Sequence, residues 1–303
     1  MRRLGLQVLT ILLVAGCCLL AVPRDRRANA AQVLYAIGTA VDAYSTDGNY
    51  VRHLPLPTIQ ANRASLAPDG NLFVSDGVIR RINSSTGANM GTFIAPGTGG
   101  LTSPTALALG PDNDLYVGMS SAILQFDGTT GAFISSFTSA NIINPMRLSF
   151  GHDGLLYVAD SGSNKILRFA SLAAGTVPDT LASVPNPTGL ALAPNGSLYV
   201  ALANASIIDL TPGTPSWTIQ PFASGTSIGL TTPNSVFVDD LGNVFVGNSG
   251  QFGPNVFEYN SSGQLLREFG TGYGVQDIVW PVPEPASVGL LGVAMGVLLR
   301  RRR

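Results

Sequence analysis

Few side chains in this sequence are arranged for chemistry, and those few lie at the ends of β-rich runs. His53 and His152 are the only histidines, and neither lies at a useful spacing from a nucleophile or from other metal ligands. Guanidinium groups bind carboxylates, so Arg63 and Arg147 could cradle an anionic ligand such as a uronate. The alternative is that both arginines pair with Asp277 or remain in solvent. The polar residues that stand at the starts or ends of β-rich runs are Asn62, Arg63, Arg147, Asp160, Asn234, Asn248 and Asp277.

The elements that would position these residues belong to an internal repeat of about 42 residues. Each repeat carries an apolar, an aromatic and a small residue in succession, at 34–36, 72–74, 115–117, 156–158, 198–200 and 244–246. The aromatic positions lie 38, 43, 41, 42 and 46 residues apart. A segment rich in Asp, Asn and Gly precedes five of the triplets. It predicts a hairpin turn, because Asn and Gly adopt positive φ at low cost. With the β-rich runs on either side, the pattern predicts four strands per repeat, which is one blade of a β-propeller.

The two ends of the repeat region complement each other. Val275–Trp280 predicts an inner strand that has no blade of its own to follow. Val33–Ile37, Val41–Tyr44 and Tyr50–Leu54 predict three strands that lack an inner one. Joining them closes a sixth blade and leaves no exposed sheet edge at the junction. The expected fold class is therefore all-β, a six-bladed propeller over residues 32–280 with four-stranded blades, closed by its N- and C-terminal strands. Apolar helical segments are expected at both termini.

The repeats resemble the NHL repeat, best at residues 155–169 and also at 187–192 with 198–200. The resemblance covers about residues 33–280. It implies a propeller of the superfamily that includes gluconolactonases and strictosidine synthases, whose members serve as binding platforms, lyases and lactonases. In such a propeller the starts of the inner strands and the loops after the second strands share one face around the central channel. The seven polar residues named above are therefore expected on this channel face, as the place for a ligand.

The resemblance to gluconolactonase-type propellers also implies a divalent cation at the channel mouth, held by a Glu, two Asn and an Asp. Asn234 and Asp277 would match an Asn and the Asp, as ligands of Ca²⁺ or Zn²⁺. No Glu occurs at a predicted mouth position, and two arginines would place positive charge beside the cation. The histidine of the propeller lyases has no counterpart, since His152 is expected in a turn on the opposite face and His53 in an outer strand. The sequence thus favours a propeller without catalytic residues or cofactor, with a metal-dependent lactonase, hydrolase or lyase as the alternative.

Residues 1–30 have the pattern of a signal peptide. Two arginines precede an apolar run, Leu4–Val22, and Ala28 and Ala30 provide small residues for signal peptidase, so cleavage after Ala30 is expected. The residues before Cys17 also resemble a lipobox, which leaves lipidation of Cys17 as an alternative. Since Cys17 and Cys18 are the only cysteines, the propeller region has no disulfide and no thiolate ligand.

The last residues form a tail of three parts. Pro283, Glu284 and Pro285 are followed by an apolar run, Ala286–Leu299, and by a basic cluster of Arg300, Arg301, Arg302 and Arg303. This arrangement resembles the PEP-CTERM signal of Gram-negative bacteria, which exosortases recognise and cut during export. Residues 281–303 are therefore expected to be a sorting signal. The apolar run has 14 residues, about 21 Å as a helix against a bilayer core near 30 Å, so it would serve as a short and transient membrane segment.

The charge balance argues against nucleic acid as a partner. The chain has 17 basic and 18 acidic residues, and removal of residues 1–31 and 284–303 would leave 8 basic and 16 acidic ones. Such an acidic surface does not attract phosphates. The expected partners are signal peptidase and exosortase during export, and then exopolysaccharide or envelope proteins, because PEP-CTERM systems accompany exopolysaccharide production. The resemblance thus implies a binding or scaffold protein of the outer envelope or extracellular biofilm matrix, anchored transiently in the inner membrane.

Overall fold

The structure is a computed structural model that describes residues 33–38, 41–45, 47–54, 61–138, 140–173, 176–213, 216–225, 229–250, 255–270 and 274–280. The predicted signal peptide, the apolar segments at both termini and the predicted sorting tail lie outside these residues. Within the described ranges, no helix is long and apolar enough to cross a membrane.

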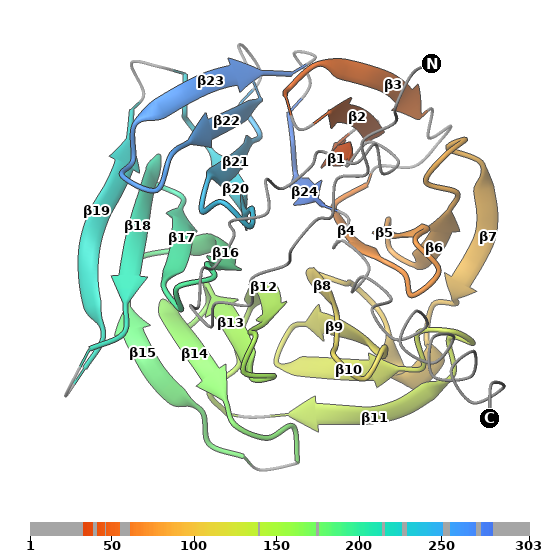
Figure 1. The fold of residues 1–303 in the computed structure, drawn as a ribbon. Coiled ribbons are helices and arrows are strands. Elements are labelled where there is room, and N and C mark those ends of the chain that lie inside the picture. The colour runs from red at the N-terminus through yellow and green to blue at the C-terminus, as the bar shows by residue number, and fades with distance from the viewer. Residues whose placement is uncertain are drawn as a thin grey trace, which may run out of the picture. The chain divides into compact units, whose positions relative to one another are not determined.

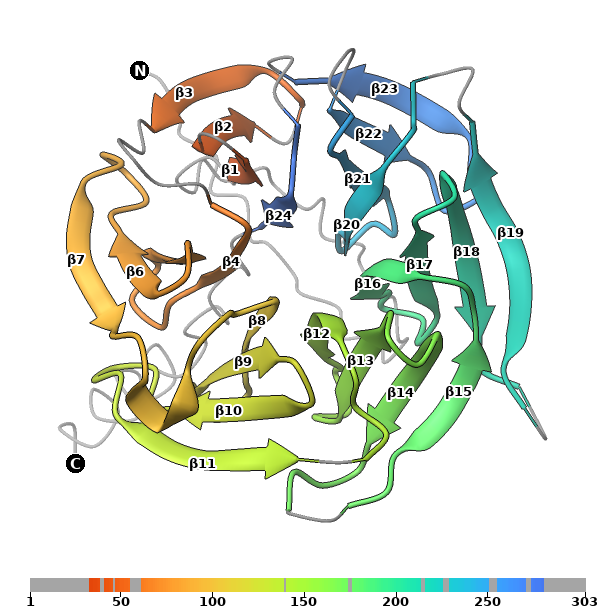
Figure 2. The same ribbon diagram turned by 180° about the vertical axis from the view of Figure 1, so that it is seen from behind.

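The described residues form six antiparallel sheets of four strands each, arranged as blades around one axis (Figures 1 and 2). Blade 1 has the order β24 (Asp277–Val279), β1 (Val33–Ile37), β2 (Val41–Ser45) and β3 (Tyr50–Leu54). Blade 2 contains β4 (Arg63–Leu66), β5 (Leu72–Ser75), β6 (Ile79–Ile82) and β7 (Asn89–Ile94). Blade 3 follows a short 3₁₀ turn, η1 (Thr98–Gly100), and contains β8 (Ala106–Leu109), β9 (Leu115–Met119), β10 (Ala122–Phe126) and β11 (Phe133–Thr138).

The second half of the ring repeats this arrangement. Blade 4 contains β12 (Pro145–Phe150), β13 (Leu156–Asp160), β14 (Lys165–Phe169) and β15 (Asp179–Ser183). Blade 5 contains β16 (Pro187–Leu192), β17 (Leu198–Leu202), β18 (Ser206–Thr211) and β19 (Thr218–Ser224). Blade 6 contains β20 (Pro233–Val238), β21 (Val244–Asn248), β22 (Val256–Tyr259) and β23 (Leu265–Phe269). The predicted fold class, with six blades of four strands, is confirmed for the described residues.

Both ends of the ring meet in blade 1, as the sequence predicted. Strand β24 pairs with β1, with Ile37 opposite Asp277 and Tyr35 opposite Val279. The inner strand is shorter than the predicted Val275–Trp280. It begins later because Val275 donates its backbone N–H to the carbonyl of Asn248 in blade 6 instead of to β1.

The core lies between neighbouring blades and is built from the first three strands of each. The aromatic residue of each triplet is at most 5 % exposed, as for Phe73, Tyr116 and Tyr199. The fourth strands are mostly exposed, so only the inner part of each blade is apolar on both faces. The hairpin turns before the triplets close as predicted, because an Asp or Asn side chain accepts the N–H two residues later, as Asp153 does from Leu155 at 3.0 Å.

Gly189 determines how closely the inner strands of blades 5 and 6 approach each other. A Cβ atom at this position would lie 3.1 Å from the Cα of Ser235 and 3.2 Å from the carbonyl oxygen of Asn234. Both contacts are tighter than ordinary van der Waals distance, so a residue with a Cβ atom would require β16 and β20 to move apart by a few tenths of an ångström.

Candidate functional site at the channel face

Six residues occupy the same position of the repeat, one at the start of each inner strand. In each blade this residue pairs with the residue directly after the triplet, as Arg63 pairs with Ser75 and Asp277 with Ile37. In ring order from blade 1 they are Asp277, Arg63, Ala106, Arg147, Gly189 and Ser235. Three of the six are small, which leaves room at the centre of the ring for two guanidinium groups and one carboxylate.

Asp277 is the centre of this arrangement and is fully buried. Its Oδ1 atom forms an ion pair with Nη2 of Arg147 and accepts hydrogen bonds from Ser235 Oγ at 3.0 Å and from the Ile278 N–H at 2.7 Å. Its Oδ2 atom accepts the N–H of Ala64 at 3.0 Å. One carboxylate therefore connects its own blade 1 with blades 2, 4 and 6. We call Asp277, Arg147 and Ser235 the closing cluster.

Arg147 reaches across the ring from blade 4 and is 7 % exposed. Its Nη2 atom donates to Ser235 Oγ at 2.8 Å in addition to the ion pair with Asp277. Its Nη1 atom is buried and has no hydrogen-bond partner among the described residues. The pairing of Arg147 with Asp277 is the alternative that the sequence offered to anion binding, and it is confirmed.

Arg63 is also buried, but it does not bind the carboxylate directly. Its Nε atom donates to the carbonyls of Thr105 at 3.0 Å and Met146 at 3.3 Å, and its Nη1 atom donates to those of Asn62 and Gln276, both at 3.0 Å. Burial lowers the pKa of Arg63 and nearby Arg147 lowers it further, while the charge of Asp277 raises it. The prediction that Arg63 pairs with Asp277 or stays in solvent is therefore wrong, because backbone carbonyls of blades 1, 2, 3 and 4 bind it.

Asn234 lies at the next layer toward solvent, in a chain of side-chain amides between blades 6 and 1. Its Nδ2 atom donates to Ser249 Oγ at 2.9 Å and to Gln276 Oε1 at 2.8 Å. Thr105 and Thr188 make the corresponding connections elsewhere, with Oγ1 donating to the carbonyl of Pro145 at 2.7 Å and of Pro233 at 2.6 Å. Asn62 is exposed at the same level. This layer therefore connects neighbouring blades, whereas the closing cluster connects distant ones.

Asp160 and Asn248 end the second strands of their blades and hold the loops that enter the same blades. Asp160 accepts the N–H groups of Ile143, Asn144 and Ser163 at 2.7, 3.1 and 2.9 Å. Asn248 Oδ1 accepts those of Thr231 and Thr232 at 3.1 and 2.8 Å. Both side chains are fully buried. Their geometry explains their positions without a ligand, because a buried loop backbone requires such acceptors.

The closing cluster is a poor set of ligands for a divalent cation. The two oxygens of Asp277 already accept four donors, and Arg63 and Arg147 add positive charge next to it. Asn234 donates its amide to neighbours and contributes at most one carbonyl oxygen. Among the residues that the structure describes, no group of three or more His, Cys, Asp and Glu side chains could hold a metal ion. Divalent cations need several convergent oxygen ligands, so this donor set does not fit one.

Sequence reasoning did not single out Ser235 as a partner of the two charged residues. The available signal was the repeat itself, because Ser235 occupies the position of Arg63, Arg147 and Asp277 in its blade. An alignment of the six repeats on their triplets would have shown that all six of these inner-strand residues are equivalent, Ser235 included.

Comparison with known proteins identifies the tail and supports the fold. Residues 281–303 match the PEP-CTERM protein-sorting motif. No curated protein matches the sequence at a significant level. A chain of the nidogen–laminin complex has a TM-score of 0.66 and 17 % identity, and the match covers 83 % of this chain and 98 % of that chain.

Two enzymes of known structure are also similar in fold. Gluconolactonase from Xanthomonas campestris has a TM-score of 0.60 and 17 % identity, with 80 % of this chain and 83 % of that chain covered. Virginiamycin B lyase from Staphylococcus aureus has a TM-score of 0.54 and 16 % identity, with 77 % and 78 % covered. At such identities the likeness shows the fold alone. The chain is thus a six-bladed β-propeller protein that carries a C-terminal PEP-CTERM motif, which implies export and processing by exosortase.

Proposed function

We propose that this protein is a non-catalytic propeller that acts as a binding or scaffold component of the outer cell envelope or the extracellular polysaccharide matrix. The observation that carries the proposal is the bonding of Asp277. Asp277, which would match the metal-binding Asp of gluconolactonase-type propellers, is buried and accepts donors from blades 1, 2, 4 and 6. Its role is to hold the ring closed, and the blades then serve as a rigid support for outer surfaces.

The proposal is tested by calorimetric titration of the purified protein with Ca²⁺ and with Zn²⁺, together with assays for hydrolysis of δ-gluconolactone. We expect neither stoichiometric cation binding nor lactone turnover above the uncatalysed rate. Asp179→Asn, which changes an exposed carboxylate of an outer strand, is the matched control for Asp277→Asn. Micromolar binding that Asp277→Asn abolishes and Asp179→Asn does not, accompanied by turnover, would replace the proposal with the metal-dependent lactonase.

Location is tested separately, by fractionating cells of a host that has an exosortase. We expect the protein in the outer-envelope or matrix fraction, and retention in the inner membrane when Pro283, Glu284 and Pro285 are all changed to Ala. The physical reason is that the prolines keep the segment extended and open to a protease. An unchanged distribution of the triple variant would contradict this route of delivery.

A further inference from the structure

A pocket of about 310 Å³ lies between blades 4 and 5, at the end of β12 that is opposite to Arg147. It is bordered by the β12–β13 turn, by the start of β13 and the end of β14, and by the β16–β17 turn and the residues next to β18 and β19. Its volume lies at the lower end of the range for small-ligand pockets, about 300–1,000 Å³. Neither the channel face nor the closing cluster contributes to it.

One side chain that lines the pocket is smaller than its counterpart in blade 4, where the equivalent residue is Phe150. Between blades 3 and 4, Phe150 covers Tyr116, with ring centroids 4.9 Å apart. The corresponding residues between blades 4 and 5 are Leu192 and Tyr157, by the register of β12 with β13 and of β16 with β17. Leucine fills less of the space above the tyrosine than phenylalanine does, and Leu192 and Tyr157 both line the pocket.

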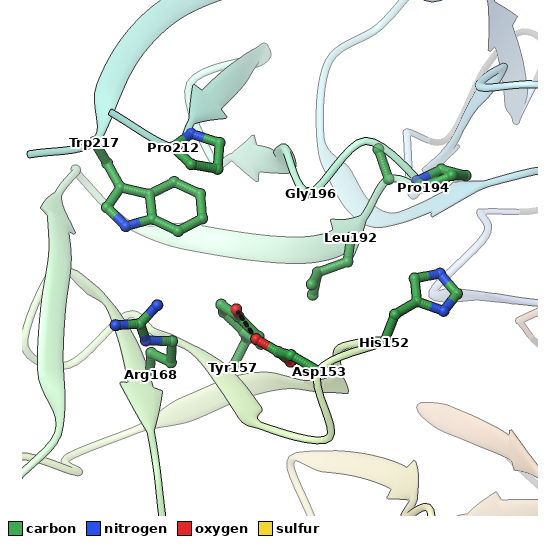
Figure 3. A pocket seen from close by; sticks show the side chains of 10 residues that line it. His152, Asp153, Tyr157, Arg168, Leu192, Pro194, Gly196, Pro212 and Trp217 are labelled. Atoms are coloured by element: carbon green, nitrogen blue, oxygen red, sulfur yellow. Dashed lines mark hydrogen bonds between the residues drawn. The ribbon is translucent and has the colours of Figure 1, made fainter. Parts of the chain in front are cut away.

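The two sides of the pocket differ in chemistry (Figure 3). Blade 5 contributes an apolar side, with the indole of Trp217 at one end and Pro212, Leu192 and Pro194 along it. Blade 4 contributes a polar side, with Arg168, Tyr157, Asp153 and His152 opposite the apolar residues. A ligand that fits must therefore have one apolar face and several hydrogen-bonding groups on the other.

The polar side is fixed in place by its own hydrogen bonds. The Tyr157 hydroxyl donates to Asp153 Oδ2 at 2.8 Å, and Asp153 Oδ1 accepts the Leu155 N–H at 3.0 Å. Arg168 donates through Nε and Nη2 to Asp179 Oδ2, at 3.2 and 2.7 Å. The guanidinium of Arg168 also hydrogen-bonds to the Tyr157 hydroxyl, which joins these two parts of the polar side. Side chains that are already ordered lose little entropy when a ligand binds.

The charges near the pocket disfavour an anionic ligand. Arg168 is matched by Asp179, and Asp153 adds a further negative charge next to Tyr157. The propeller as a whole is acidic once the terminal segments are discounted, with 8 basic and 16 acidic residues. The excess negative charge would repel an anionic ligand such as a uronate or a phosphate.

We propose that this pocket binds a neutral pyranose ring, either as a free hexose or as one unit of an uncharged polysaccharide. The apolar C–H face of the ring stacks on the indole of Trp217, and its hydroxyl groups exchange hydrogen bonds with Asp153, Tyr157 and Arg168. The site is separate from the channel face, and it adds a ligand class to the binding role proposed above. If no sugar binds to this pocket, the cation titration and the localisation experiment described above still decide the proposed function.

The experiment is a titration of the full chain, purified in a detergent without a sugar head group, followed by tryptophan fluorescence and calorimetry. The probes are glucose, mannose and galactose and the neutral tetrasaccharides of each. Trp280, the other tryptophan, is 9 % exposed and stacks on Phe237 at 5.2 Å, so a Trp280→Phe variant assigns the signal to Trp217. We expect saturable binding of at least one neutral sugar that shifts the emission of Trp217. Binding of the tetrasaccharide alone would point to a polysaccharide as the source.

Two variants decide whether the pocket is the site. Leu192→Phe copies the arrangement of the neighbouring blade, so the fold should be kept while the ring space is filled; we expect affinity to fall about tenfold or more. Trp217→Ala should give a loss of the same order, because aromatic anchors dominate such contacts. Tyr50→Ala removes an aromatic residue that is 54 % exposed on β3, outside the pocket, and should not change affinity.

Three results would overturn the proposal. The first is no saturable binding of any neutral sugar by the parent protein. The second is binding that Leu192→Phe and Trp217→Ala leave unchanged while their melting temperatures stay at the parent value. The third is stronger binding of tetragalacturonate or of a proline-rich decapeptide than of every neutral sugar, which would assign the pocket to another ligand class.

Discussion

Replacement of Asp277 by Ala removes a carboxylate that connects four blades, so it tests the closing cluster most directly. The change leaves the guanidinium of Arg147 buried without its partner and deprives Ser235 Oγ and the Ala64 N–H of their acceptor. Removing one member of a buried ion pair costs about 3–5 kcal/mol, and buried donors left unpaired add about 1–3 kcal/mol each. We therefore expect the free energy of unfolding to fall by about 4 kcal/mol or more.

The assay is urea unfolding of residues 32–280, followed by circular dichroism. With a slope of about 3 kcal/mol per molar urea for a domain of this size, the expected loss moves the midpoint down by about 1.3 M or more. The control is Asp179→Ala, which breaks the pair with Arg168 in which the carboxylate side chain is 61 % exposed. Exposed pairs contribute about 0–1 kcal/mol, so this midpoint should move by about 0.3 M at most.

A second variant separates the lost ion pair from a general packing defect. Arg147→Met removes the buried cation, and Asp277→Ala in that background should cost clearly less than in the parent protein, because there is one charge fewer to leave unpaired. If Asp277→Ala costs no more than Asp179→Ala, or costs the same with and without Arg147, then the closing cluster does not stabilise the ring as reasoned here.

Three further changes test other parts of the structure. Gly189→Val should lower the melting temperature by an amount that corresponds to about 1–3 kcal/mol, since its Cβ would lie 3.1 Å from the Cα of Ser235, and an unchanged melting temperature would show that β16 can move. Burial raises the pKa of the Asp209 carboxyl in the folded protein above its value in the unfolded chain. The carboxylate charge therefore destabilises the fold, and this loss of stability develops as pH rises from the unfolded-state pKa through the folded-state pKa. In acid the carboxyl is protonated in both states, so it has no such effect. Asp209→Asn should therefore raise the urea midpoint near pH 7 and leave it unchanged near pH 3, and the opposite order would refute this sign. Burial also raises the pKa of Tyr259 to about 12, and its hydroxyl finds no hydrogen-bond partner among the described residues. Tyr259→Phe should thus be neutral or stabilising by about 1 kcal/mol in the same assay, and a clear loss would mean that the hydroxyl is bound.

The ring and its closure could be predicted from the sequence because both depend on local patterns. Each triplet and the Asp or Asn turn before it fix one hairpin, and the register of the hairpin fixes which side chains enter the core. The inner strand missing at the N-terminus and the surplus one at residues 275–280 left a single way to pair β24 with β1.

The contacts at the channel could not be predicted in the same way. The reach of Arg147 to Ser235, 88 residues later, depends on the small residues Ala106 and Gly189 at equivalent positions of the ring. The direction of a long side chain is decided by its neighbours in space rather than by its own segment. The pocket beside Trp217 is a similar case, since its lining residues belong to two blades and meet only once blades 4 and 5 lie side by side.

The pairing of β24 with β1 also sets an order of events for a chain that is exported. Strand β1 begins at Val33 and receives its inner partner only at Asp277–Val279, so the first blade of the ring cannot be completed until nearly all of the propeller has been delivered. Contacts between such distant segments form late in folding. The sorting motif begins at residue 281, two residues after that partner strand ends. Completion of the fold and arrival of the sorting motif therefore fall at the same point in the passage of the chain, and an incompletely delivered chain has neither a closed ring nor a motif for exosortase.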